Sequence, residues 1–302
     1  GQPSSSQNSE TLSLLSTLDS RAPLPSARKL VSSGEEETAK KRKMDRAESC
    51  GDGAVMEKKE TKWEYSAPSV PTSHWIDRGF DENYIQGMEV FLHMIKDSTC
   101  VLRSGACPQN LFFGGRPGQG GTNIVLLHDD ALLPHWQEFG NALQLCQNFG
   151  DLHRFCIYKV QLSPSIISLL APALKDKPIE TFALDNTAFV NAREGIDFAI
   201  EIIQSNQRLN KFAWANNPIE SMDDTTRFVD AIISHPLIDT IRLVNCFGEN
   251  VDAYSILRSL LASNKQFSHI DLESNNMRTG GSTEIPDYLV TNPPLEYLVL
   301  AN

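Results

Sequence analysis

The stretch GRPGQGGT, Gly115 to Thr122, carries glycines and a threonine at nearly the spacing of a phosphate-binding loop. Such a loop follows the pattern GxxxxGK[ST], in which a lysine and backbone amides surround phosphate at the start of a helix. Here Gly121 stands where the lysine belongs, and the next residues, NIVLL, are strand-like. We therefore expect a flexible turn into a first repeat strand, with Arg116 exposed, and no nucleotide site.

Four residues just after this turn, His128, Asp129, Asp130 and His135, are of the types that bind metals. Their spacing does not make them converge, because the first three follow a strand directly and the last follows Pro134 in a new helix. The sequence contains no GxSxG motif and no other distinct set of catalytic residues. We expect no enzyme activity, no metal and no cofactor.

The general properties of the chain are those of an intracellular protein. No run of 18 apolar residues could span a membrane, and no signal peptide precedes a cleavage site. The cysteines are scattered without CxxC spacing, as expected for reduced thiols. They are Cys50, Cys100, Cys107, Cys146, Cys156 and Cys246.

Charge divides the chain into two regions. Residues 1–62 contain 11 Lys/Arg and 10 Asp/Glu, a net of +1, which leaves 16 and 28 for residues 63–302, a net of -12. The first region has few bulky apolar residues and is predicted to be a disordered tail. The acidic second region is poorly suited to nucleic-acid phosphates, so no nucleic acid is expected to bind it.

The tail contains two basic clusters, Arg28-Lys29 and Lys40-Lys41-Arg42-Lys43, separated by ten residues. This arrangement is typical of a bipartite nuclear localisation signal, which an import receptor binds through acidic pockets. A solvated charge run is the alternative interpretation. The sequence thus predicts a location in the nucleus, the cytoplasm or both, with an import receptor as a possible partner of the tail.

The acidic region repeats itself. Five segments fit the frame LxxLxL, at steps of 30, 29, 29 and 28 residues, and a sixth lies 27 residues before the first. These frames begin at Leu152, Ile179, Leu209, Ile238, Phe267 and Leu295. The first, fourth and sixth positions are predicted to point inward, which makes Trp214 a core residue. At the ninth position stand Asn217, Cys246 and Asn275.

Apolar residues at helical spacing lie between the frames. They predict helices over residues 163–176, 194–206, 225–235 and 252–264, with Ser163 as a cap and Pro164 at the first helical position. Upstream, residues 81–98 and 134–148 are predicted to form helices of an N-terminal cap and an early repeat. Each unit is therefore strand, loop and helix.

In period and frame, residues 120–302 resemble leucine-rich repeats of the ribonuclease-inhibitor type. The resemblance implies an α/β fold, a right-handed horseshoe solenoid with parallel strands on the concave face and helices on the convex face. Thr187 and Val160 replace Asn at the ninth position, so we expect the buried polar ladder to be interrupted there. The predicted domains are a tail (1–62), a helical cap and linker (63–120) and a solenoid (121–302).

A concave sheet is the surface that such folds usually present to a protein partner, and the function expected by analogy is a non-enzymatic interaction scaffold. The third, fifth, seventh and eighth frame positions are predicted to be exposed there. The candidate partner-binding residues are Arg154, Tyr158, Lys159, Asp185, Asn186, Lys211, Asn216, Arg242, Asn245, His269, Asp271 and Glu273.

Two other functions fit the repeats. Ran GTPase-activating proteins use similar repeats, which makes a regulator of a small GTPase the main alternative. Such proteins usually have an acidic tail after the array, and none is present in this sequence. A sensor domain of an innate immune receptor would require an upstream nucleotide-binding module. Because the last frame stops at its eighth position, Asn302, we also expect the native protein to continue beyond it.

Overall fold

A computed structural model describes residues 63–106, 108–114, 124–146, 153–277, 283–291 and 293–301. The chain divides into two units, Gly1–Trp63 and Glu64–Asn302. The predicted disorder of the tail and the import cluster, Arg28, Lys29 and Lys40 to Lys43, lie outside the described residues. The glycine-rich turn, residues 115–122, also lies outside them.

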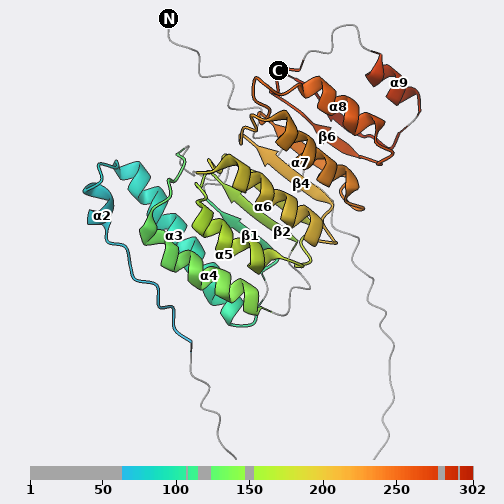
Figure 1. Cartoon of the computed structure of the whole chain (residues 1–302). Coiled ribbons are helices and arrows are strands. Elements are labelled where there is room, and N and C mark those ends of the chain that lie inside the picture. Colours follow the sequence, from blue (N-terminus) through green and yellow to red (C-terminus); the bar gives the residue numbers. More distant parts are fainter. Residues whose placement is uncertain are drawn as a thin grey trace, which may run out of the picture. The chain divides into compact units, whose positions relative to one another are not determined.

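The second unit is an α/β structure in which seven parallel strands form one open sheet (Figure 1). The strands follow one another in chain order across the sheet. They are β1 (Asn110–Phe113), β2 (Arg154–Tyr158), β3 (Thr181–Asp185), β4 (Lys211–Ala215), β5 (Thr240–Val244), β6 (His269–Asp271) and β7 (Tyr297–Val299). Neighbouring parallel strands need a crossover connection, and here each connection contains a helix.

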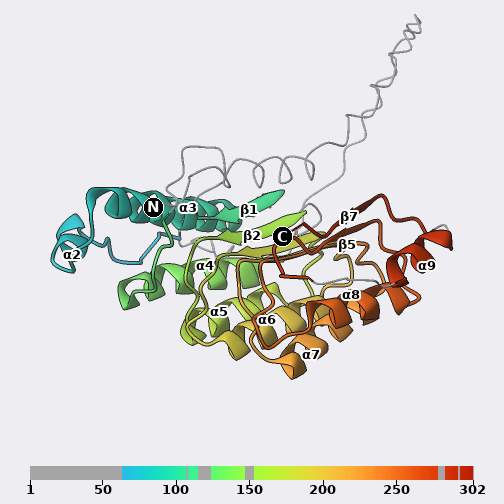
Figure 2. The same cartoon turned by 90° about the horizontal axis from the view of Figure 1, so that it is seen from above.

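Helices that follow the strands lie along one face of the sheet (Figure 2). They are α4 (Leu133–Leu145), α5 (Pro164–Leu174), α6 (Ala192–Ser205), α7 (Met222–Ser234), α8 (Ala253–Ala262) and α9 (Glu284–Val290), with a short 3₁₀ turn at Asp130–Leu132. All predicted helices are present, and Ser163 caps α5 by accepting a hydrogen bond from the Ile166 amide at 3.4 Å. The small helix α9 was not predicted.

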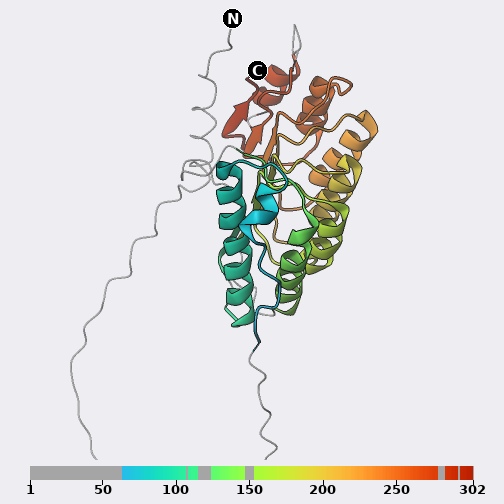
Figure 3. The same ribbon diagram turned by 90° about the vertical axis from the view of Figure 1, so that its left-hand side faces the viewer.

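Helices α2 (Thr72–Ile76) and α3 (Glu82–Arg103) precede the sheet. Helix α3 packs beside α4 and against β1, so it covers the first edge of the sheet, as expected of an N-terminal cap (Figure 3). Its apolar stripe includes Phe91, whose ring lies 5.7 Å from that of Trp136 in α4. None of the described helices is long and apolar enough to cross a membrane.

Strand β1 begins upstream of residue 121, where the repeats were predicted to start. The prediction of NIVLL as the first strand is wrong, because Leu126 makes only an isolated bridge to Val160. Leu126 thus takes the ninth frame position, and the segment between Gly114 and Leu126 is an insertion. At Gly114 the chain passes so close to β2 that a Cβ atom would lie 1.7 Å from the Tyr158 carbonyl oxygen, so only glycine fits.

The sheet register confirms the repeat frame. Third frame positions pair with one another across β2 to β7, and the fourth and sixth positions point into the core. Phenylalanines at the fourth position stack across strands: Phe155 on Phe182 at 5.8 Å and Phe182 on Phe212 at 6.2 Å between ring centroids. Trp214, as predicted, is a core residue with 1% of its surface exposed.

Buried asparagines at the ninth position join successive repeats. Asn217 accepts hydrogen bonds from the amide and hydroxyl of Thr187, both at 2.8 Å, and donates to the Leu184 carbonyl at 3.1 Å. Asn275 likewise accepts from the amides of Cys246 and Phe247. At Thr187, which replaces asparagine, the hydroxyl bonds to the asparagine of the next repeat, Asn217. These bonds satisfy backbone groups that would otherwise be buried without partners.

Candidate binding face of the sheet

Helices α4 to α9 cover one face of the sheet (Figure 2), and we name the other face the strand face. Because side chains alternate along a strand and the fourth and sixth positions are in the core, the third, fifth and seventh frame positions belong to the strand face. The register arranges them in rows across the strands. The third-position row reads Arg154, Thr181, Lys211, Thr240, His269 and Tyr297. The fifth-position row reads Cys156, Ala183, Ala213, Arg242, Asp271 and Val299.

Arg242 and Asp271 form an ion pair between β5 and β6, with 2.9 Å between Nε and Oδ2. Both residues were predicted to be exposed, but each has only 7% of its surface exposed. They are neighbours in the fifth-position row, so each neutralises the other where an isolated charge would be costly. The second oxygen of Asp271 accepts a hydrogen bond from the Glu273 amide at 3.1 Å. This pair therefore belongs to the framework of the face.

An apolar cluster occupies the strand face over β1 to β4. It consists of Phe112, Cys156, Tyr158, Ala183 and Ala213. The rings of Phe112 and Tyr158 stack with centroids 6.4 Å apart. Tyr158 was predicted to be exposed, yet it retains only 8% exposure. Burial, together with the nearby Cys156 and Asp185, raises the pKa of its phenol, which is therefore neutral at physiological pH.

Asp185 lies at the carboxyl end of β3 and begins a chain of side-chain hydrogen bonds. Asn216 donates to its Oδ1 at 2.8 Å, and Asn245 donates in turn to Oδ1 of Asn216 at 2.9 Å. Burial raises the pKa of Asp185, against the lowering influence of Asn216, Arg242 and Lys159. The carboxyl is thus held in a poorly hydrated position, where its charged form is disfavoured.

The eighth frame position has a left-handed backbone in five successive repeats. The residues and their φ angles are Lys159 (53°), Asn186 (53°), Asn216 (53°), Asn245 (46°) and Ser274 (61°). Each amide there donates to the seventh-position carbonyl of the next repeat, as from Asn216 to Val244 at 2.9 Å. Asparagine tolerates this conformation better than most residues. Asn186, Asn216 and Asn245, predicted as partner contacts, therefore have a conformational role that explains their presence.

No protein-family model and no curated protein sequence matches the chain. Any resemblance of the chain to a family therefore rests on its repeat frame, its strand register and its turns.

The remaining predicted contacts lie toward the rims of the strand face. Three of them are half-buried cations: Arg154 on β2, Lys159 just after β2 and Lys211 on β4. His269 is half-buried and stacks on Tyr297 of β7, with ring centroids 4.4 Å apart. Tyr297 is 56% exposed and was not among the predicted contacts, although its third-position place in the frame could have indicated it.

Glu273 follows β6 at the seventh position. Its Oε2 atom is buried and has no hydrogen-bond partner within the part of the chain that the structure describes. The neighbouring seventh positions on β4 and β5 are Ala215 and Val244, which are 2% and 4% exposed. The strand face therefore carries a carboxylate oxygen beside small apolar side chains.

The acidic and histidine residues considered for metal binding have other partners. Asp129 pairs with Arg78 and with His74, the latter at 3.2 Å, and it accepts a hydrogen bond from the Ala131 amide. The His128 ring lies 3.4 Å from Asp130, whereas the ring of His135 contacts the Tyr65 hydroxyl at 2.7 Å. Among the described residues, no group of three or more His, Cys, Asp or Glu could hold a metal.

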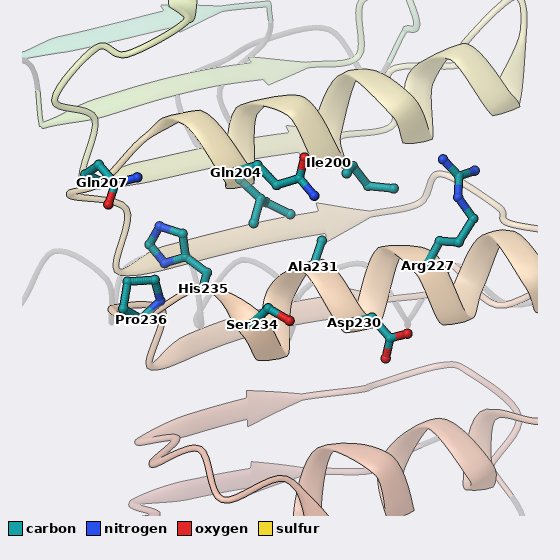
Figure 4. A pocket seen from close by; sticks show the side chains of 10 residues that line it. Ile200, Gln204, Gln207, Arg227, Asp230, Ala231, Ser234, His235 and Pro236 are labelled. Atoms are coloured by element: carbon teal, nitrogen blue, oxygen red, sulfur yellow. The ribbon is translucent and has the colours of Figure 1, made fainter.

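A groove of about 600 Å³ between α6 and α7 was not predicted (Figure 4). Its lining includes Ile200 and Gln204 from α6 and Ala231 and Ser234 from α7. The small residues of α7 face α6 and leave the groove between the helices. His235 closes one end, held by its Nε2 contact with the Asn206 carbonyl at 3.0 Å. The lining offers hydrogen-bonding side chains on an apolar floor.

Proposed function

We propose that the chain is a leucine-rich-repeat protein of the ribonuclease-inhibitor type that acts as a non-enzymatic scaffold. In this proposal the repeats form a solenoid, and the strand face, its concave surface, binds another protein. The support for the fold is the combination of parallel strands in chain order, a left-handed residue at the eighth position of five successive repeats, and buried asparagines at two of the ninth positions. Repeats of this kind are stabilised by stacking on their neighbours.

The observation that carries the binding proposal is the contrast between the two sides of each strand. The core side has the same apolar character in all repeats, because stacking requires it. The strand face changes in charge and size from one repeat to the next, for example from Lys211 to Thr240 to His269. Such variation is not needed for stacking, so it favours recognition of a partner. The net charge of -12 for residues 63–302 makes a protein a better partner than a nucleic acid.

A matched pair of variants tests the proposal. The strand-face variant carries Lys211→Glu and Tyr297→Ala, which change the charge and remove an exposed ring without touching the Arg242–Asp271 pair. The control variant carries Arg193→Glu and Leu237→Ala, both at exposed positions outside the strand face. The full chain is used to capture proteins from nuclear and cytosolic lysates, and each captured protein is then purified and titrated.

We expect at least one directly binding partner whose affinity falls about tenfold or more in the strand-face variant and stays unchanged in the control, as for loss of interface anchor residues. Circular dichroism of both variants checks that they fold. A partner that binds both variants equally would move the site elsewhere, for instance to the groove between α6 and α7.

Delivery to the nucleus is a separate part of the proposal. The clusters at Arg28-Lys29 and Lys40 to Lys43 would bind an import receptor through their positive charge. A chain fused to a fluorescent protein is expected to accumulate in nuclei, and changing the second cluster to alanine is expected to abolish the accumulation. Unchanged nuclear accumulation would exclude this signal.

A further inference from the structure

In the seventh-position row of the strand face, two carboxylates flank two small apolar residues. Asp185 pairs in register with Ala215, and Ala215 with Val244. Two residues beyond the Arg242–Asp271 pair, the same register brings Val244 opposite Glu273. The row therefore reads Asp185, Ala215, Val244 and Glu273 across four adjacent strands. Three strand spacings separate the two carboxylates, about 14 Å.

Both carboxylates are incompletely satisfied among the described residues. The Oδ1 atom of Asp185 accepts one hydrogen bond, from Asn216, and Oε2 of Glu273 is buried without a hydrogen-bond partner. A carboxylate out of water is costly unless a cation or hydrogen-bond donors compensate it. In the neighbouring row, Arg242 donates its Nε to Asp271, and its charge lowers the pKa of the Asp185 carboxyl. Lys159 also faces Asp185, and its charge lowers the carboxyl pKa without removing the net rise caused by burial.

The surface between the two carboxylates consists of small apolar side chains. Ala215 and Val244 are almost fully buried and offer only methyl groups. A partner side chain that reaches this floor must itself be small and apolar to remove water without leaving polar groups unpaired. The row therefore combines an apolar centre with negative ends.

We propose that this row binds an extended segment of a partner protein with two cationic side chains flanking a small apolar one. The inference rests on the proposed function and names the chemistry of its partner. An extended chain rises about 3.3 Å per residue, so residues i and i+4 lie about 13 Å apart. Residues i, i+2 and i+4 share one face of such a segment. The expected pattern is Lys/Arg, any residue, Val/Ala, any residue, Lys/Arg, laid across β3 to β6 with the cations on Asp185 and Glu273.

The test uses fluorescent peptides and the full chain. The probe has the core Lys-Thr-Val-Thr-Lys between Gly-Ser flanks, and two matched peptides replace both lysines by glutamine or move the lysines two residues apart. Binding is measured by anisotropy at low salt and again at 0.5 M salt. Protein variants are Asp185→Asn and Glu273→Gln, with Asp230→Asn and Glu201→Gln as controls at exposed carboxylates on helices α7 and α6.

We expect the probe to bind at least tenfold more tightly than either matched peptide, and each row variant to weaken it about fivefold to tenfold, as for truncation of a partly desolvated charge pair. High salt is expected to weaken binding by screening the exposed charges. The control variants leave the affinity unchanged. Equal binding of the glutamine peptide, or unchanged affinity in both row variants, overturns the inference.

This outcome is distinguishable from failure of the proposed function. If a captured partner is lost in the Lys211→Glu, Tyr297→Ala variant while the lysine peptide binds no better than the glutamine peptide, the strand face still binds proteins and the basic-segment inference is wrong. If the captured partner binds that variant normally, the proposed function itself fails, whatever the peptide does.

Discussion

The two faces of the sheet use the same strands for different purposes. On the core side, residues such as Phe155, Phe182 and Phe212 repeat in type and stack on one another. On the strand face, the residues opposite each other differ, for example Lys211, Thr240 and His269 in the third-position row. The comparison teaches that the core side explains the fold, whereas the strand face contains features that folding alone does not require.

The largest expected effect is a difference in the free energy of unfolding between variants at two adjacent residues of β4, which point to opposite faces of the sheet. Phe212→Ala should lower the free energy of unfolding by about 3 to 5 kcal/mol, because it leaves a cavity between stacked rings. Lys211 is half-buried on the strand face, and Lys211→Ala should change the free energy of unfolding by less than about 1 kcal/mol. Urea denaturation followed by circular dichroism measures both. Similar losses for the two variants would show that the faces do not differ as described.

The buried ion pair tests whether part of the strand face is structural. Asp271→Ala should cost about 3 kcal/mol or more, because it leaves the Arg242 guanidinium buried without its partner. The double variant Arg242→Met, Asp271→Leu should recover most of that loss, since neither charge is then buried. The same denaturation experiment, with the single variants Arg242→Met and Asp271→Leu added, gives the four values of a double-mutant cycle. A fully additive cycle would mean that the two side chains do not interact.

The asparagine ladder gives a somewhat smaller effect. Asn217→Ala removes the acceptor of the Thr187 amide and the donor to the Leu184 carbonyl, leaving buried backbone groups unpaired. We expect a loss of about 2 kcal/mol in the free energy of unfolding. Asn245→Ala, at an exposed place, is the control for loss of an asparagine and should cost about 1 kcal/mol through its left-handed backbone. Equal costs would argue against a buried ladder.

Much of this arrangement was predictable from the sequence. The period of the frame placed strands β2 to β7 and the helices between β2 and β6, because stacking fixes which residues are apolar. Strand β1 was missed since Pro108 stands at the first position of its frame and an insertion follows Gly114. The pairing of Arg242 with Asp271 could have been deduced, because opposite charges stand at the fifth position of consecutive frames.

Other features were missed or could not be predicted from the sequence. The left-handed turns were missed, because the recurring asparagine at the eighth position was interpreted as a partner contact. The groove between α6 and α7 depends on how two helices pack, and a pattern within one helix does not determine that. The low exposure of Tyr158 likewise depends on neighbours from other repeats, including Phe112 on β1.

Lowering the pH should destabilise the chain through His235, which lies just after α7 on the helix side of the sheet. Its Nδ1 atom accepts from the Leu237 and Ile238 amides, and burial lowers the pKa of the ring, so the folded chain favours the neutral form. The unfolded chain then binds more protons, and stability should fall as the pH drops through about 6.5, by about 1.4 kcal/mol per unit of pKa difference. Urea midpoints at pH 7.5 and 5.5 measure this. A slope that His235→Asn leaves unchanged would assign it to other groups, such as His135, whose pKa burial also lowers.

The smallest expected effect has the opposite sign and lies on the strand face. Burial raises the pKa of Asp185, so its ionised form destabilises the folded chain at neutral pH, and this cost disappears as the pH falls through the raised pKa. Asp185→Asn should therefore increase the free energy of unfolding at pH 7 by up to about 1 kcal/mol, while it weakens binding of the basic peptide. A residue that costs stability and contributes to binding has a functional role that folding does not explain. If Asp185→Asn instead destabilises the chain at pH 7 and leaves peptide binding intact, the carboxylate is a structural partner of Asn216 and the strand face loses its strongest sign of recognition.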